Sequence, residues 1–160
     1  MRIAAPKALM DAKEEPASAV KELFQRLFDA HSAHVCAIDL SGRIIVVNRA
    51  WTDFGRANGL AADYDMEAQN YLDVCERAAA SGDVFAEQAL VGLLDVLHTG
   101  RRKFVLTYPC HAPWERRWFK LWVEPQMPDL PVIVIAHQLE RAERVAAASN
   151  DVAANYAFST

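Results

Sequence analysis

The stretch from Phe104 to Pro125 constrains the fold most strongly, because apolar and polar side chains alternate along it twice, on either side of a short loop. Alternation at period two places successive side chains on opposite faces of a β-sheet. One face of the second strand is core-like and carries Phe119, Leu121 and Val123. Trp118 and Trp122 fall on the other face, which antiparallel sheets usually keep polar. We therefore expect a helix of the same chain or a second copy to cover the two indoles.

Composition limits the class of protein. A chain of 160 residues fits one domain, and a domain of that size buries roughly 70% of its unfolded surface. Its 52% hydrophobic and 24% charged residues are typical of a globular fold. The net charge of -4 argues against general nucleic-acid binding, which needs a basic surface. No apolar run approaches the ~20 residues that span a membrane.

Cysteine usage favours the cytoplasm. Cys36, Cys75 and Cys110 are odd in number, widely spaced and without a CxxC pair. Reduced thiols in an intracellular protein are the simplest interpretation. The start of the chain also lacks an apolar segment long enough for export. We expect a cytoplasmic protein.

The N-terminal region predicts a flexible segment over residues 1–15 and an amphipathic helix over residues 16–34. The apolar positions of this helix recur at helical spacing, and they are Val20, Leu23, Phe24, Leu27 and Phe28. This stripe either covers Trp118 and Trp122 within the same chain or contacts a second subunit or partner. Both alternatives are open at this stage, because apolar terminal helices serve both purposes.

The remaining elements follow an order without the βαβ alternation of a parallel sheet. A hairpin over residues 35–47 precedes Asn48, which is a strong N-cap residue for the next helix. The further elements are helices over 49–58, 71–80 and 85–97, and strands over 104–108, 118–123 and 130–139. An Ala-rich helix or tail is expected over residues 140–160.

Three strings together resemble the PAS domain over residues 35–139. They are IDLSGRIIVVN at 38–48, NYLDVC at 70–75 and YPCHAPWERRWF at 108–119. The resemblance implies an α+β fold, with a five-stranded antiparallel sheet, helices on one face around a small pocket, and flanking N-terminal and C-terminal helices. It also implies a sensor or interaction module in signal transduction, usually a homodimer.

The residues outside 35–139 are too few for a histidine kinase, a cyclase or a DNA-binding domain. The sequence is therefore similar in build to stand-alone bacterial PAS proteins. We expect a non-enzymatic regulator that acts through contacts with signalling proteins, such as histidine kinases or phosphotransfer proteins, and that homodimerises. The residues expected at these contacts are Val20, Leu23, Phe24, Leu27, Phe28, Trp118 and Trp122.

The alternative function is a sensor whose pocket binds a small apolar molecule or haem and so controls partner binding. The candidate pocket residues are Trp51, Phe54, Tyr71, Phe85, Leu94 and Leu97, although such side chains more often simply fill a core. Some PAS domains hold haem through a histidine on the long helix. His98 lies at the extreme end of that helix, where it suits the helix dipole better, so we expect no resident cofactor.

Cys110 and His111 invite a nucleophile-and-base interpretation. Adjacent residues on an extended chain point in opposite directions, and no third group is present to orient the histidine. Pro109 and Pro113 also place the pair in a loop. We expect neither catalysis nor a metal site here, because no second pair of ligands occurs at a suitable spacing.

Overall fold

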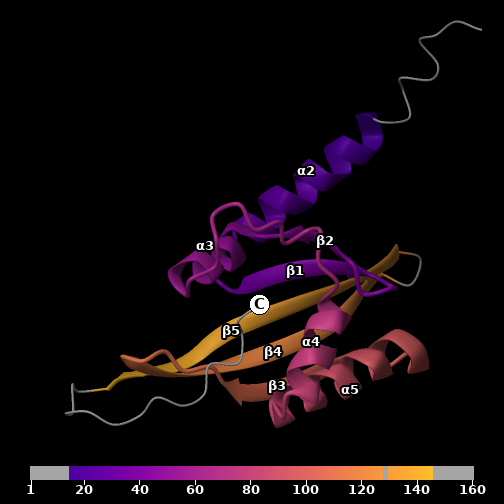
Figure 1. Cartoon of the computed structure of the whole chain (residues 1–160). Coiled ribbons are helices and arrows are strands. Elements are labelled where there is room, and N and C mark those ends of the chain that lie inside the picture. Colours follow the sequence, from indigo (N-terminus) through magenta and orange to yellow (C-terminus); the bar gives the residue numbers. More distant parts are fainter. Residues whose placement is uncertain (1–14, 128–129, 146–160) are drawn as a thin grey trace, which may run out of the picture.

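The computed structural model describes residues 15–127 and 130–145 (Figure 1). Its strands form one antiparallel sheet in the order β2-β1-β5-β4-β3. The strands are β1 (His34–Asp39), β2 (Ile44–Val47), β3 (Phe104–Pro109), β4 (Glu115–Met127) and β5 (Leu130–Arg144). The helices are α2 (Glu15–Asp29), α3 (Arg49–Ala57), α4 (Tyr71–Ala80) and α5 (Val84–Thr99). The predicted α+β fold with a five-stranded antiparallel sheet is confirmed.

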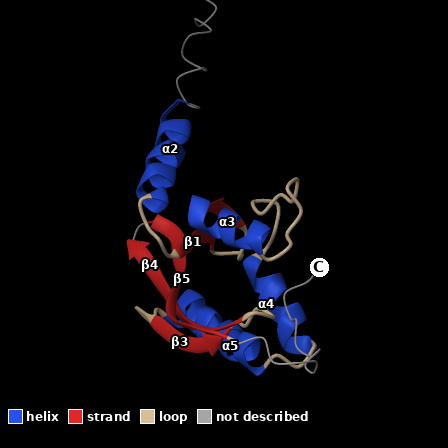
Figure 2. Ribbon diagram, turned by 90° about the vertical axis from the view of Figure 1, so that its left-hand side faces the viewer, coloured by secondary structure: helices blue, strands red, loops and turns tan. Residues whose placement is uncertain are grey.

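One face of the sheet, here called the inner face, carries three helices. Figure 2 shows α3, α4 and α5 on this side, whereas α2 extends away from the sheet. The apolar core lies between the inner face and α4 and α5, because alternate strand residues point toward those helices. Its fully buried strand residues include Cys36, Ile38, Leu121, Val123, Ile133 and Ile135.

Side-chain caps start the three inner-face helices. Asn48 accepts a hydrogen bond from the Trp51 amide, and Asp83 accepts from the amides of Phe85 and Ala86. Asn70 caps α4, and its amide nitrogen also donates to the carbonyl of Ser41 in the β1–β2 turn. These caps satisfy amide groups that the first helical turn leaves unpaired. They confirm the predicted role of Asn48.

The β1–β2 turn positions the start of α4. Gly42 has φ of 87°, which L side chains rarely adopt, and a Cβ there would lie 2.6 Å from Asn70 and Leu72 atoms. This close approach lets the Gly42 carbonyl accept from the Tyr71 amide at 2.8 Å. The turn therefore fixes where Tyr71 enters the inner face.

The end of β5 differs from the sequence expectation. A helix or tail was predicted from residue 140, but Glu140–Arg144 continue the strand. Arg141 to Arg144 pair with Glu115 to Trp118 of β4, and this pairing overrides the helical propensity of the segment. The predictions for residues 1–14 and 146–160 lie outside the described residues.

Helix α2 meets the sheet only near its C-terminal end. Phe28 is buried on the outer face against a small apolar cluster that includes Val35, Ala37 and Val46. The Arg49 amide donates to Asp29 at 2.6 Å, and the Gln25 side chain donates to the Val47 carbonyl. The last turn of α2 is therefore attached to β2 and to the start of α3.

Trp118 and Trp122 are half-buried on the outer face, and no described helix lies across them. The Arg141 guanidinium lies 3.7 Å from the Trp118 ring centroid, and the Lys120 ammonium lies 5.9 Å from that of Trp122. Long cationic side chains thus shield both indoles. The expectation that the N-terminal helix covers them within the same chain is wrong for the described residues.

Candidate functional site

The inner face divides into an apolar half and a polar half. Near α5 the inward positions carry only buried apolar residues, whereas near α3 they carry histidine, tyrosine and arginine. The register pairs His34 of β1 with His137 of β5, and His137 with Leu121 of β4. These polar side chains occupy strand positions that face the same side of the sheet as the apolar core. We therefore take this end of the inner face as the candidate site.

His137 is the centre of the polar half. Its Nε2 lies 3.0 Å from the Tyr71 hydroxyl of α4, and its Nδ1 lies 2.6 Å from the Tyr108 hydroxyl of β3. The Trp51 ring of α3 meets His137 edge-on, with 5.2 Å between centroids. We call these four side chains, which come from four elements, the His137 cluster.

The protonation state of the His137 cluster follows from its burial. Burial, with a smaller contribution from His34, lowers the pKa of His137 to about 3. Burial likewise raises the pKa of both Tyr71 and Tyr108 well above 10. Near neutral pH the imidazole is neutral and both phenols keep their protons. A neutral ring has one donor and one acceptor nitrogen, so one tyrosine donates to it and the other accepts from it.

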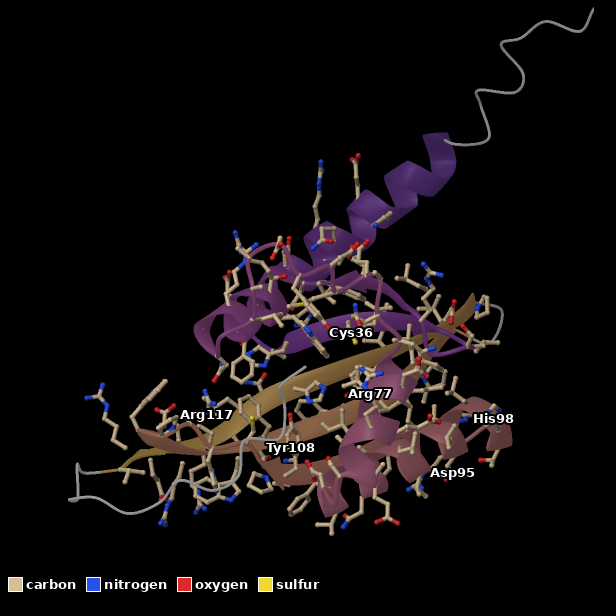
Figure 3. The ribbon with its side chains drawn as sticks, viewed as in Figure 1. Cys36, Arg77, Asp95, His98, Tyr108 and Arg117 are labelled. Atoms are coloured by element: carbon tan, nitrogen blue, oxygen red, sulfur yellow. The ribbon has the colours of Figure 1, made fainter. Side chains whose placement is uncertain are left out.

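Arg117 lies at the open end of the same face. It is only 8% exposed, and its carbon Cζ lies 5.0 Å from the Phe54 ring centroid of α3. Its Nε donates to the Cys110 carbonyl at 2.9 Å, and its Nη2 donates to Asn58 Oδ1 at 3.0 Å. Figure 3 shows Arg117 and Tyr108 below α3. The guanidinium therefore ties the end of α3 to the loop between β3 and β4.

Aromatic rings lie beside Arg117. His34 lies 4.3 Å from Phe54 between ring centroids, and Phe119 lies 5.5 Å from each of them. Tyr108 stacks on Phe119 at 5.9 Å, which links this group to the His137 cluster. Burial and the nearby Arg117 charge lower the pKa of His34, so the neutral form of this imidazole is favoured. The result is an aromatic wall beside one buried positive charge.

Comparisons with known proteins bear on the fold. The structure of the PAS domain from Bordetella pertussis BvgS covers 77% of this chain and 88% of its own, with a TM-score of 0.52 and 17% identity. The phage VqmA–DPO complex covers 80% of this chain and 56% of its own, with a TM-score of 0.51 and 19% identity.

The chain has the PAS fold.

Sequence relatives add less. No family model matches the chain. An uncharacterized 104.1 kDa protein in the hypE 3′ region of Rhodobacter capsulatus is 35% identical over 106 residues. That match covers 65% of this chain but only 11% of the relative. The chain therefore spans a small part of the length of this curated relative.

The six predicted pocket residues do not all lie in one place in the PAS fold. Trp51 and Tyr71 meet in the His137 cluster, with 6.2 Å between ring centroids. Phe54 lies beside Arg117, whereas Leu97 packs against the apolar core. Phe85 and Leu94 are half-buried on α5. Two of the six residues therefore lie in the His137 cluster, and a third lies in the wall beside it.

Sequence reasoning missed His34, His137, Tyr108, Arg117 and Phe119 as site residues. The signal in the sequence was the alternation of side chains at period two along the strands. His137 follows Ile133 and Ile135 at period two, and Arg117 precedes Phe119 in the same way. A polar residue that continues an apolar alternation points into the core side of a sheet. That signal identifies the face, but only the tertiary fold brings the four strands and two helices together.

The predicted partner-contact residues also lie in different parts of the fold. Phe28 packs within its own chain and does not belong to the exposed stripe, whereas Leu23 and Leu27 are 57% and 55% exposed. Trp118 and Trp122 lie on the sheet back. Val20 and Phe24 lie within α2, and their side chains lie outside the described set. Contact with a partner through these residues stays a prediction.

Three other features concern catalysis, haem and membranes. The Arg117 amide donates to His111 Nδ1 at 3.0 Å, and burial raises the pKa of Cys110 although Arg117 opposes the shift. Cys110 and His111 therefore do not resemble an activated thiolate–imidazole pair.

The His98 side chain is exposed at the end of α5, so it does not point into the interior, where it would have to lie to bind a haem iron. In residues 15–127 and 130–145, no helix is long and apolar enough to cross a membrane.

Proposed function

We propose that this PAS-fold chain is a non-enzymatic signalling regulator that acts through protein contacts. The first contact is with a second copy of the chain, and the further partners are histidine kinases or phosphotransfer proteins. The exposed apolar stripe of α2 carries the dimer proposal. The partner class rests on the sequence resemblance to the PAS domain, which implies a sensor or interaction module in signal transduction.

Helix α2 has two faces with different roles. Lys21, Gln25 and Phe28 face the domain, since Lys21 pairs with Glu67 at 2.7 Å and Gln25 donates to Val47. Leu23 and Leu27 point away from it and are more than half exposed. Val20, Leu23 and Leu27 follow the spacing of three and four residues found in the seam of paired helices. A second α2 with the same seam is the matching surface.

Light scattering of the whole chain tests this function. We expect the wild type to have twice the mass of the single chain, and Leu23→Asp/Leu27→Asp to have the single-chain mass. Val91→Asp, an exposed apolar position on α5, is the matched control and should keep the dimer. A wild type of single-chain mass at high micromolar concentration contradicts the proposal.

The second candidate function is a small-molecule sensor, and the His137 cluster favours it. This cluster places three hydrogen-bonding side chains and an indole on the inner face, where Tyr71 is buried and His137, Tyr108 and Trp51 are half-buried. The structure of phage VqmA, which has the same fold, is described in complex with DPO. The visible absorption of freshly purified protein and mass spectrometry of its denatured extract test this function. Colourless protein that releases no small molecule counts against it.

A further inference from the structure

We propose that the polar half of the inner face binds a small organic monoanion, with its carboxylate on Arg117 and its planar apolar body against Phe54 and Phe119. The proposal rests on the second candidate function, ligand sensing, and assigns the chemical class of the ligand. Four observations carry it: a buried charge without a counter-ion, unused hydrogen-bond donors, an aromatic wall and partial access to solvent.

The first observation is that Arg117 is buried without a carboxylate. Within residues 15–127 and 130–145, all the ion pairs involve other residues, which lie on the surface or near it. Taking an unpaired charge out of water is costly, so buried guanidinium groups normally have an anionic partner. Within the described residues, the hydrogen-bond partners of Arg117 are neutral groups, namely the Cys110 carbonyl, the Cys110 side chain and the Asn58 amide oxygen. A negative charge is the missing component.

The second observation concerns the donors that remain. A guanidinium has five N–H groups in one plane, and the two hydrogen bonds of Arg117 use one on Nε and one on Nη2. The Cys110 side chain is a further partner of the guanidinium, which leaves two N–H groups without an acceptor within the described part of the chain. Adjacent N–H groups in one plane match the two oxygens of a carboxylate.

The third observation is the aromatic wall. Phe54 stacks beneath the guanidinium, and His34 and Phe119 contact Phe54 edge-on or tilted. Within the described residues, no acidic residue takes part in these ring contacts, although the Asp83 carboxylate raises the pKa of the nearby Tyr108 and Cys110. A wall of rings suits a planar apolar body better than it suits a strongly hydrated ion such as phosphate.

The fourth observation is access. His34, Phe54, Tyr108 and His137 are each only half-buried. Solvent therefore reaches part of the inner face at the Arg117 end. One positive charge at such an entrance selects a monoanion.

A purely structural role for Arg117 is the competing interpretation, because the side chain ties α3 to the β3–β4 loop. The two roles differ in their effect on binding. A structural clamp affects stability alone, whereas a ligand site discriminates between charged and neutral molecules of the same shape. The experiment therefore compares isosteric probes on the intact chain.

Isothermal titration calorimetry with benzoate, benzamide and inorganic phosphate tests the proposal. We expect benzoate to bind, and benzamide and phosphate to bind at least about tenfold more weakly, since a charge-assisted pair contributes about that factor or more. Equal binding of benzoate and benzamide overturns the proposal, as does tighter binding of phosphate. Failure of benzoate to bind at millimolar concentration overturns it as well.

Variants then locate the site. Arg117→Gln should weaken benzoate binding by roughly tenfold to a hundredfold, whereas Arg116→Gln, an exposed neighbour with the same charge change, should leave it within twofold. If Arg117→Gln unfolds, Phe54→Leu supplies the second test, because it removes the ring and keeps the charge. Equal affinity in Phe54→Leu and the wild type contradicts the aromatic wall.

The outcome is separable from the broader functions. A small molecule found in the denatured extract that is neutral supports sensing but overturns the anionic class. The mass of the α2 variants by light scattering does not depend on Arg117. Failure of the anion proposal therefore leaves the dimer proposal to its own test.

Discussion

Asn48 holds three elements together through one side chain. Its Oδ1 accepts from the amides of Val35 and Trp51, and its Nδ2 donates to the carbonyls of Phe28 and Ala33. The residue is fully buried, so its amide group depends on these protein partners rather than on water. The sequence predicted the cap on α3, but not the other three bonds, because they join segments that only the fold brings together.

Replacement of Asn48 by Ala should therefore destabilise the domain strongly. We expect a loss of about 2–4 kcal/mol in the free energy of unfolding, because buried amides and carbonyls lose their partners. Urea denaturation measures this loss. Asn70→Ala, a cap in a more exposed position, is the control and should cost about 1 kcal/mol. Equal losses in the two variants contradict the central role of Asn48.

His137 should make stability depend on pH. Its pKa is about 3 in the folded chain and about 6.5 in the unfolded chain, so the unfolded chain binds more protons between these values. Stability is therefore complete above pH 6.5 and falls as the pH decreases toward 3. The expected loss is about 2 kcal/mol between pH 6.5 and pH 5. His34, whose pKa is also lowered, adds to it in the same direction.

Urea denaturation at pH 7 and at pH 5 measures this dependence. His137→Gln should lose much less stability over this interval than the wild type, since the variant has no imidazole to protonate. His98→Gln, at an exposed position on α5, should behave like the wild type. The account of His137 is wrong if all three proteins lose the same amount.

At the scale of elements, α5 and β3 meet through a close approach of Gly92 and Phe104. A Cβ on Gly92 would lie 2.2 Å from an atom of the Phe104 ring. Gly92→Ala gains about 1 kcal/mol of helix propensity but forces the ring aside. We expect a net destabilisation of about 1–3 kcal/mol from this overpacking.

Thermal or urea denaturation of single and double variants measures this contact. Phe104→Leu in the Gly92→Ala background should recover part of the loss, because the smaller side chain leaves room for the methyl group. If Gly92→Ala alone is as stable as the wild type, the contact is looser than the structure indicates.

Strand and helix positions were largely predictable because apolar periodicity is local. The end of β5 was not, since Glu140–Arg144 consists of good helix formers and its strand conformation depends on pairing with distant β4 residues. The stripe on α2 was predictable as well. Its division between the domain and the exterior was not, because Phe28 is held by β-strand residues far along the chain.

For the whole molecule, α2 is the element that the proposed dimer places against another copy. Its last turn is attached to α3 and β2, the helix extends away from the sheet (Figure 1), and its Leu23 and Leu27 are more than half exposed. The inner-face site and α2 are linked through α3, which carries Phe54 and Trp51 at one side and is hydrogen-bonded to Asp29 at its start. In the two proposals taken together, α3 connects the ligand site to the dimer contact.

Covalent cross-linking at the centre of the α2 seam tests the dimer most directly. Leu23→Cys in a Cys110→Ser background leaves one exposed thiol, because Cys36 and Cys75 are buried. With a short bis-maleimide, we predict that most of the Leu23→Cys protein becomes a covalent dimer at low micromolar concentration, whereas Val91→Cys in the same background stays a single chain. Equal cross-linking of the two variants, or none in either, would contradict the pairing of α2 with a second copy.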